Sequence, residues 1–310
     1  MNIIFFGSGA FGVKTLEILR ETRHNIALVV TQPDRQKGRH MRLSATPVKE
    51  FAQRHGLEVF QPQNVNTATC CLELQKMNAD IFLVVAYGMI LSEELLQMPR
   101  ALAMNIHASL LPKYRGAAPI HWAIRNGEKE SGITFIKMNK RMDAGDVILQ
   151  KKIKITPKDT TPALEEKLSL LAAQSLPEVL AKLEKGKLGL IKQDGRKTTL
   201  APLLKKSDGL IDWHWSSAEV FNHLRAMVNW PGSFTKFKGK TLKILSMEMG
   251  RKMTLGRPGE ILSVAPTGLQ VACGQGTVVI KEVLPESHHR MSIESFLAGH
   301  NIHPGDLLGV

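Results

Sequence analysis

Cysteine is scarce in this sequence, with three among 310 residues, at positions 70, 71 and 273. Two of them are adjacent and none is spaced as Cys-x-x-Cys, which excludes a disulfide framework and argues against structural zinc. Long apolar runs are also missing, because no run approaches the roughly 18 residues of a membrane span. The sequence opens on the apolar run 1–9 without a basic leader, so we expect neither a signal nor a transit peptide. These absences predict a soluble, cytoplasmic protein that needs no metal.

The composition that remains is that of a globular protein with more than one domain. Its 310 residues are twice the usual domain length of about 150. Hydrophobic residues make up 43% and charged residues 22%, which excludes a disordered or fibrous chain. The net charge is +13, and residues 185–206 alone contribute seven basic residues against one acidic residue. A strip of this kind is either a solvated spacer or a surface that contacts a polyanion.

Short apolar runs alternate with amphipathic segments through the first 150 residues. The strand-like runs lie at 3–7, 26–30, 81–86, 103–106, 132–138 and 147–155, and the helical patterns lie at 12–21, at 46–54 and from 91. This alternation predicts an α/β fold, with a doubly wound, mostly parallel Rossmann-like sheet that helices cover on both faces. Ligands of such sheets bind at the carboxyl ends of the strands.

The pattern changes after this α/β region. Residues 161–184 have helical spacing, and the basic segment 185–206 follows as a linker. After a short helix near 217–226, five short strand patterns are separated by glycine and proline, which is typical of a small OB-like β-barrel domain. We therefore predict domains at 1–184 and 207–310, joined by the linker.

A glycine-rich turn, GSGAFG, follows the first strand pattern. Gly7, Gly9 and Gly12 match the dinucleotide fingerprint, and Asp34 ends the second strand pattern about 20 residues on. Asp34 opens a long, basic segment instead of a short turn, so we expect no nicotinamide cofactor. The turn is then a tight strand–helix connection.

That basic segment has two interpretations. From 34 to 54 it carries six basic and two acidic residues, in a connection unusually long for one without a function. It is either a solvated loop or an arm that grips phosphates.

The strongest local signal is an Asn-x-His pair, Asn105 and His107, at the end of a strand pattern. Side chains at i and i+2 point to the same face of a strand, so both can donate hydrogen bonds to a developing oxyanion. A satisfied buried polar pair is the plainer interpretation. Asp143 follows His107 by 36 residues on a glycine-containing loop, and a carboxylate there can orient and charge the imidazole. The three residues therefore predict a catalytic site that stabilises a developing oxyanion.

These residues resemble a known family. Asn-x-His, SLLP, YRGAAPI and MDAGD are the signature of folate-dependent formyltransferases. Within this superfamily, the chain most resembles the methionyl-tRNA formyltransferase family over its whole length. The motifs that carry this narrower resemblance are TQPD with TPVK, the WPG at 230–232, and the closing MSIESF and PGDLLG. The basic segment 34–54, called the basic arm below, contains the sequence GRHMRLS. The family usually has a second glycine after the first arginine and a lysine before the leucine.

The resemblance implies a reaction. The formyl group of 10-formyltetrahydrofolate passes to the α-amino group of methionine on initiator methionyl-tRNA, giving N-formylmethionyl-tRNA for translation initiation. Asn105 is expected to hold the formyl oxygen, protonated His107 to donate a second hydrogen bond and then a proton, and Asp143 to take a proton from the amine.

The resemblance also implies a folate site and a tRNA surface. The expected folate contacts are Tyr87, Gly88, Met89, Ile90, Leu91, Ser109, Leu110, Leu111 and Pro112. The expected tRNA contacts are Arg35, Lys37, Arg39, Arg42, Lys192, Arg196, Lys197, Lys205 and Lys206. Domain 1–184 is then catalytic, domain 207–310 binds tRNA, and the protein is expected to be a monomer.

Three alternatives stay open at this point. The same catalytic residues can transfer a formyl group to a sugar nucleotide, but that reaction would not explain the basic arm and the basic linker. It also serves hydrolysis of formyltetrahydrofolate, with water as the acceptor. The third alternative is a non-catalytic RNA-binding protein on a degenerate Rossmann-like core, and the intact catalytic set argues against it.

Overall fold

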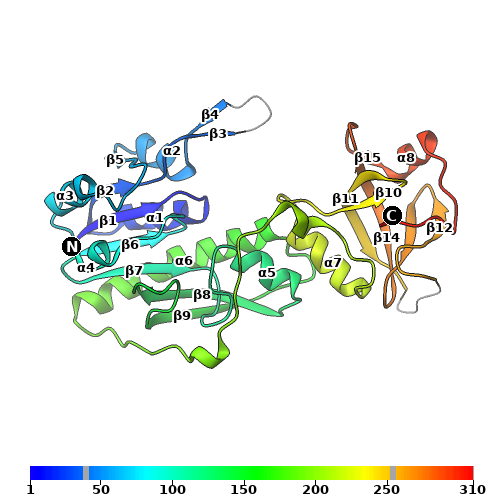
Figure 1. Cartoon of the computed structure of the whole chain (residues 1–310). Helices are drawn as coiled ribbons and strands as arrows, with labels where there is room; N and C mark the ends of the chain where they lie inside the picture. The colour runs from blue at the N-terminus through cyan, green and yellow to red at the C-terminus, as the bar shows by residue number, and fades with distance from the viewer. Residues whose placement is uncertain (38–41, 252–255, 310) are drawn as a thin grey trace. The chain divides into compact units, whose positions relative to one another are not determined.

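The computed structural model of the chain describes residues 1–37, 42–251 and 256–309, which form two compact units (Figure 1). The first unit comprises Met1–Pro119, Glu130–Lys154 and Leu164–Pro202. The second unit comprises Ile120–Lys129, Ile155–Ala163 and Leu203–Val310.

A seven-stranded sheet forms the centre of the first unit, in the order β5-β2-β1-β6-β7-β8-β9. The strands are β1 (Asn2–Gly7), β2 (Asn25–Val30), β5 (Val59–Phe60), β6 (Ile81–Val85), β7 (Leu102–His107), β8 (Glu130–Lys137) and β9 (Val147–Lys154). The first five in this order are parallel, whereas β8 pairs antiparallel with β7 and β9 pairs antiparallel with β8. The predicted mostly parallel α/β sheet is confirmed.

Helices follow most of the parallel strands. They are α1 (Phe11–Glu21), α2 (Pro47–Arg54), α3 (Ala68–Lys76), α4 (Glu93–Gln97) and the long α6 (Thr161–Glu184). Thr46, Thr67 and Ser92 each cap a helix, with the side-chain oxygen accepting from the backbone N–H three residues on. The central strands are buried on both faces, as β1 and β6 show, and this is why they read as continuous apolar runs.

The glycine-rich turn is explained by close packing. A Cβ at Gly7 would lie 2.6 Å from the Phe5 ring, and one at Gly12 would lie 3.1 Å from the carbonyl oxygen of Val85. Asp34 accepts from Lys49 Nζ at 2.7 Å and from Gln61 Nε2 at 2.8 Å, and the Lys49 hydrogen bond lowers the pKa of the carboxyl. The acidic residue of the fingerprint is therefore engaged inside the fold.

The second unit contains the predicted antiparallel β domain. Its strands are β10 (Phe234–Phe237), β11 (Lys240–Met249), β12 (Ile261–Ala265), β13 (Gly268–Ala272), β14 (Thr277–Pro285) and β15 (Met291–Ser292), and its helices include α5 (Pro119–Arg125), α7 (Ser217–Ala226) and α8 (Ile293–Gly299). The sheet order is β10-β11-β14-β13-β12, and β15 pairs with β14. Leu308 bridges to Phe237 on β10, and Leu307 bridges to Glu260 beside β12. The C-terminal segment thus joins the two edges of the sheet, as in a closed barrel.

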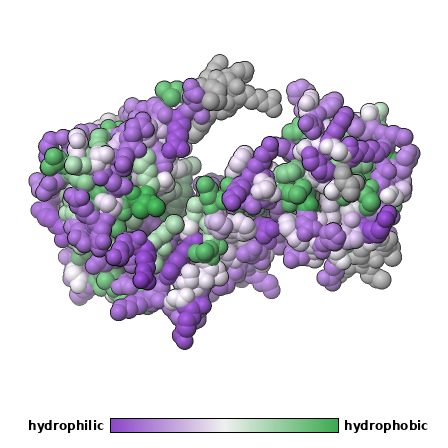
Figure 2. All heavy atoms as spheres, in the orientation of Figure 1, coloured by the Kyte–Doolittle hydropathy of each residue, from purple (hydrophilic) through white to green (hydrophobic). Residues whose placement is uncertain are grey.

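The surface is mainly hydrophilic on the face that Figure 2 shows, with hydrophobic side chains in small separate groups. Within the described part of the chain, none of the helices combines the length and the apolar character of a membrane span.

One histidine is enclosed in the second unit. His223 on α7 has no exposed surface, and its Nε2 lies 3.2 Å from the carbonyl oxygen of Gly209, so Nε2 carries the proton. Its Nδ1 is buried and has no hydrogen-bond partner among the described residues. Burial therefore lowers the pKa of His223 to about 4.

We expect this histidine to weaken the second unit in acid. Between pH 6.5 and about 4 the unfolded chain binds a proton at His223 that the folded chain does not, so the free energy of unfolding falls as the pH drops. The loss is roughly 3 kcal/mol at most, from about 1.4 kcal/mol per unit of pKa difference. Urea titrations from pH 7 to 4 measure it, with His223→Gln as the reference because a glutamine does not titrate. Parallel pH profiles for the two proteins would contradict the expectation.

Candidate active site

Strand β7 carries the first two candidate residues. Asn105 pairs with Ile136 and His107 with Thr134 on the neighbouring strand β8, so backbone pairing holds both residues. Asn105 is partly exposed, whereas only 6% of His107 is exposed. The alternation of a strand places the two side chains on the same face.

The ring of His107 is held by a backbone carbonyl. Its Nε2 lies 2.8 Å from the carbonyl oxygen of Tyr114, and a carbonyl oxygen can only accept, so Nε2 donates. The other ring nitrogen, Nδ1, lies 3.6 Å from Oδ2 of Asp143. Nδ1 is therefore the nitrogen available for proton exchange on the Asp143 side.

Asp143 arrives from the loop that joins β8 to β9. Its Oδ2 accepts from the backbone N–H of Gly116 at 2.9 Å, and its Oδ1 lies 3.4 Å from Nδ2 of Asn105. Asp143 adopts a left-handed backbone conformation, with φ +51°, which is uncommon outside glycine. The structure thus brings together all three predicted catalytic side chains, from two segments far apart in the sequence.

The predicted folate residues follow two adjacent strands. Tyr87–Leu91 begins two residues after β6, and Ser109–Pro112 begins two residues after β7; because β6 and β7 are parallel neighbours, both segments lie at the same edge of the sheet. The Tyr87 ring is buried, packs edge-on against Phe6 at 5.5 Å, and has its pKa raised to about 12 by burial. Ser109 is also buried and donates to the carbonyl oxygen of Lys113. These two side chains are buried, so a ligand would meet the backbone, the exposed Ile90 and the partly exposed side chains of the two segments instead.

The basic segment 185–206 is attached to this site over part of its length. Ile191 exchanges two backbone hydrogen bonds with Val147 at the start of β9, at 2.8 and 2.9 Å. Further on, the N–H of Arg115 donates to the carbonyl of Thr199, and the N–H of Ala201 donates to the carbonyl of Arg115. Gly116 lies so close to this segment that a Cβ there would be 2.5 Å from the Ala201 carbonyl oxygen. This attachment was not predicted from the sequence, where the segment is recognisable only as a charged strip, because backbone pairing leaves no local signature.

The predicted tRNA contacts lie on exposed parts of the chain where they are described. Arg35 is exposed and begins the short hairpin β3 (Arg35–Lys37) and β4 (Arg42–Ser44). Arg39 lies outside the described residues, and the structure describes only the backbone of Lys37 and Arg42. The candidates in the basic segment are all exposed: Lys192, Arg196, Lys197, Lys205 and Lys206. Among them, Arg196 pairs with Asp194 through two hydrogen bonds of 3.0 and 3.1 Å.

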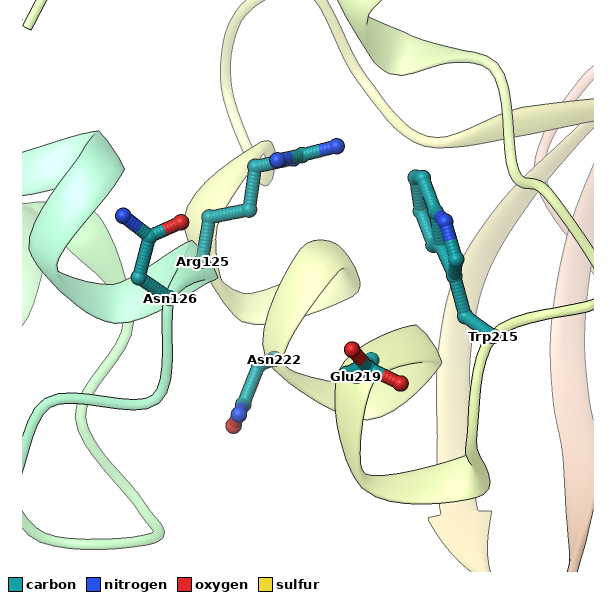
Figure 3. A pocket seen from close by; sticks show the side chains of 5 residues that line it. All are labelled: Arg125, Asn126, Trp215, Glu219 and Asn222. Atoms are coloured by element: carbon teal, nitrogen blue, oxygen red, sulfur yellow. The ribbon is translucent and has the colours of Figure 1, made fainter. Parts of the chain in front are cut away.

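A hollow of about 320 Å³ lies in the second unit, lined by Arg125, Asn126, Trp215, Glu219 and Asn222 (Figure 3). The Arg125 guanidinium lies over the Trp215 ring, 4.8 Å from its centroid, and Glu219 caps α7 through Ser216. The hollow contains none of the predicted site residues, and we assign it no role.

Comparisons with known proteins identify the family. Residues 1–180 match the formyl transferase domain, and residues 203–301 match the formyl transferase C-terminal domain. The chain is 43% identical over 309 residues to the methionyl-tRNA formyltransferase of Geobacter metallireducens, covering all of this chain and 99% of that protein. It is 42% identical over 310 residues to the enzyme of the same name from Acetivibrio thermocellus, covering both proteins completely.

A solved structure supports the fold. An N-formyltransferase from Helicobacter canadensis, in complex with folinic acid and dTDP-3-aminofucose, superposes with a TM-score of 0.67 at 17% identity, covering 90% of this chain and 98% of that one. Full-length identity above 40% to named relatives, together with both domain matches, decides the family. The chain belongs to the methionyl-tRNA formyltransferase family.

Proposed function

We propose that the chain carries out the reaction of its family with Asn105, His107 and Asp143 as the catalytic group. The enzyme transfers the formyl group of 10-formyltetrahydrofolate to the α-amino group of methionine on initiator methionyl-tRNA. The observation that carries the residue assignment is the approach of one carboxylate to two β7 side chains, 3.4 Å from Asn105 Nδ2 and 3.6 Å from His107 Nδ1.

Asn105 stabilises the charge that develops on the formyl oxygen. When the amine attacks the formyl carbon, that oxygen gains negative charge, and an amide N–H already in place donates to it without reorganisation. Removing one such donor typically lowers kcat by about 10²–10³-fold.

His107 supplies the proton for the leaving group. Because its Nε2–H is committed to the Tyr114 carbonyl, the transferable proton lies on Nδ1, and the Asp143 carboxylate stabilises that protonated ring. As the bond between the formyl carbon and the folate nitrogen breaks, that nitrogen takes the proton, and tetrahydrofolate leaves. Asp143 accepts the proton that the attacking amine loses, through a water, so that the protons balance.

We further propose that the folate ring system binds along the backbone of 87–91 and 109–112. The support is their shared position at the carboxyl edge of β6 and β7, where ligands of open α/β sheets bind. The proposal needs no metal and no nicotinamide.

The proposed tRNA surface consists of the basic arm, the basic segment and domain 207–310. We expect a Lys192, Lys197, Lys205 and Lys206 to Gln variant to raise the KM for charged tRNA and to flatten its salt dependence. Each lost phosphate contact reduces the log–log salt slope by roughly 0.7–0.9. Steady-state kinetics across a salt series measure this effect, and the KM for 10-formyltetrahydrofolate should stay constant.

Arg196→Gln is the matched control for that variant. Its guanidinium charge is already compensated by Asp194, so it should change the slope less than an average lysine does. An unchanged salt slope in the four-lysine variant would show that the basic segment is a solvated spacer that does not contact tRNA.

Transfer to a sugar nucleotide remains the second candidate, because the Helicobacter canadensis enzyme shares the fold. The seven basic residues of 185–206 have no use in that reaction. Labelled formyl donor offered with either initiator methionyl-tRNA or a dTDP-amino sugar separates the two: we expect label only in the tRNA fraction. Label in the sugar would overturn the assignment.

We also propose that the enzyme acts as a monomer in the cytoplasm, where charged tRNA is used. Sedimentation at working concentration tests the oligomeric state. In this proposal, the domain predicted at 1–184 is catalytic, and the domain predicted at 207–310 binds tRNA.

A further inference from the structure

Gln193 lies in the basic segment between its two points of attachment to the first unit. On one side Ile191 pairs with Val147, and on the other Thr199 and Ala201 pair with Arg115. The position of Gln193 relative to the β8–β9 loop and to Arg115 is therefore held by backbone on both sides.

Every hydrogen-bonding position of the Gln193 amide is used. Its Nε2 donates to the carbonyl oxygens of Asp143 at 2.8 Å and Gly145 at 2.7 Å. Its Oε1 accepts from Nε and Nη2 of Arg115, at 3.2 and 2.7 Å. Carbonyls can only accept and a guanidinium can only donate, so the partners permit one orientation of the amide.

The two donated bonds hold the backbone that presents the catalytic carboxylate. Asp143 has a φ of +51°, and a non-glycine residue stays in that conformation only where its surroundings fix it. Gly145 is seated so closely that a Cβ would lie 1.7 Å from the Lys137 carbonyl oxygen, so the loop has little room to adjust. Losing the Gln193 bonds would release the Asp143 end of this loop.

Arg115 completes the connection. Its backbone precedes Gly116, whose N–H donates to Oδ2 of Asp143 at 2.9 Å. The Gln193 amide thus links, through its two ends, the loop that carries Asp143 and the loop that donates to the Asp143 carboxylate.

We propose that Gln193 is a positioning residue for Asp143, acting on its backbone and through Arg115. This inference rests on the proposed role of Asp143. Displacing a catalytic group by about 1 Å can lower the rate about 10²-fold. The expected signature is a fall in kcat with little change in either KM, because Gln193 acts on Asp143 and not on either substrate.

The test uses the full chain and two variants at one position. Gln193→Met removes all the hydrogen bonds at similar size. Gln193→Glu keeps an acceptor for Arg115 but turns a carboxylate oxygen toward two carbonyl oxygens. Both should lower kcat about 10²-fold, with the KM for 10-formyltetrahydrofolate and for charged tRNA within about threefold. Gln61→Met is the matched control, because Gln61 also donates two amide hydrogen bonds in the first unit, to Gln32 and Asp34, and it should keep its kcat.

A double-mutant cycle with Arg115→Met tests the connection. If Arg115 acts on Asp143 through Gln193, the Arg115→Met/Gln193→Met protein should be no slower than Gln193→Met alone, because residues that act as a unit are non-additive. Strictly additive losses would overturn the shared action.

The outcomes separate this inference from the function on which it rests. All kcat values are taken per folded protein, from the thermal transition of each variant. If Asp143→Asn is inactive and Gln193→Met and Gln193→Glu keep normal kcat, the positioning role is wrong and the catalytic assignment stands. If Asp143→Asn keeps normal turnover, the catalytic assignment is wrong and the inference is lost with it. A loss in the Gln193 variants that appears only in KM, or only in the folded fraction, also overturns the positioning role.

Discussion

Replacing Asp143 with Asn is expected to lower kcat for formylation of charged initiator tRNA by at least about 10³-fold, equivalent to about 4 kcal/mol of transition-state stabilisation. The amide keeps the shape of the side chain, but it can neither stabilise a protonated His107 at 3.6 Å nor accept the proton of the amine. Single-turnover formylation with saturating donor measures the chemical step.

His107→Ala should cause a similar loss, and the double variant should lose little more than the slower single variant, since both belong to one proton-transfer unit. Asp146→Asn is the control, because Asp146 is the other acid of the same loop and does not contribute to the proposed chemistry. Near-normal turnover in folded Asp143→Asn protein would contradict the mechanism.

Removing the C-terminal β domain is expected to lower kcat/KM for charged initiator tRNA by orders of magnitude. Binding energy from the remote tRNA body positions the reacting amine, and a chain ending at Pro202 has lost that energy. It keeps the catalytic group, both folate segments and the pairing of Thr199 and Ala201 with Arg115, so it should still bind 10-formyltetrahydrofolate. Its melting temperature should fall, because Arg225 no longer holds the carbonyls of Thr156 and Asp159.

A chain ending at Lys185 is the informative comparison. It lacks the same β domain and, in addition, the attached part of the basic segment. Both shortened chains should hydrolyse 10-formyltetrahydrofolate slowly without an acceptor, and the Lys185 chain should do so more slowly than the Pro202 chain. Equal formylation of tRNA by the Pro202 chain and the full chain would show that the C-terminal domain does not bind tRNA.

The fold was largely predictable because its main signals are local. Residues 161–184 and 217–226 have helical spacing and form α6 and α7 with those bounds. The reversed direction of β8 was not predictable, because a buried apolar run reads the same in either direction. The hairpin of β3 and β4 inside the basic arm was missed for a different reason, since three-residue strands carry too short a pattern.

In the candidate site, too, the features with a local sequence signal were predictable and those that depend on tertiary contacts were not. Asn105 and His107 lie two positions apart on one strand, so their shared face follows from the sequence. That Asp143 reaches them is a tertiary fact, expected from the family resemblance more than from spacing. The carbonyl of Tyr114 carries no sequence signal, because any residue has a backbone carbonyl. Gln193 carries none either, because its partners are a side chain and two backbone carbonyls that lie far from it in the sequence.

Transfer of a formyl group to charged tRNA at this site is tested most directly by the release of tetrahydrofolate. The purified full chain is given 10-formyltetrahydrofolate with charged initiator methionyl-tRNA, with uncharged initiator tRNA, or with no acceptor. We predict fast, stoichiometric release only with the charged tRNA, matched by formyl label on methionine and abolished in Asp143→Asn. Release at the same rate in all three reactions would contradict this account and identify a hydrolase.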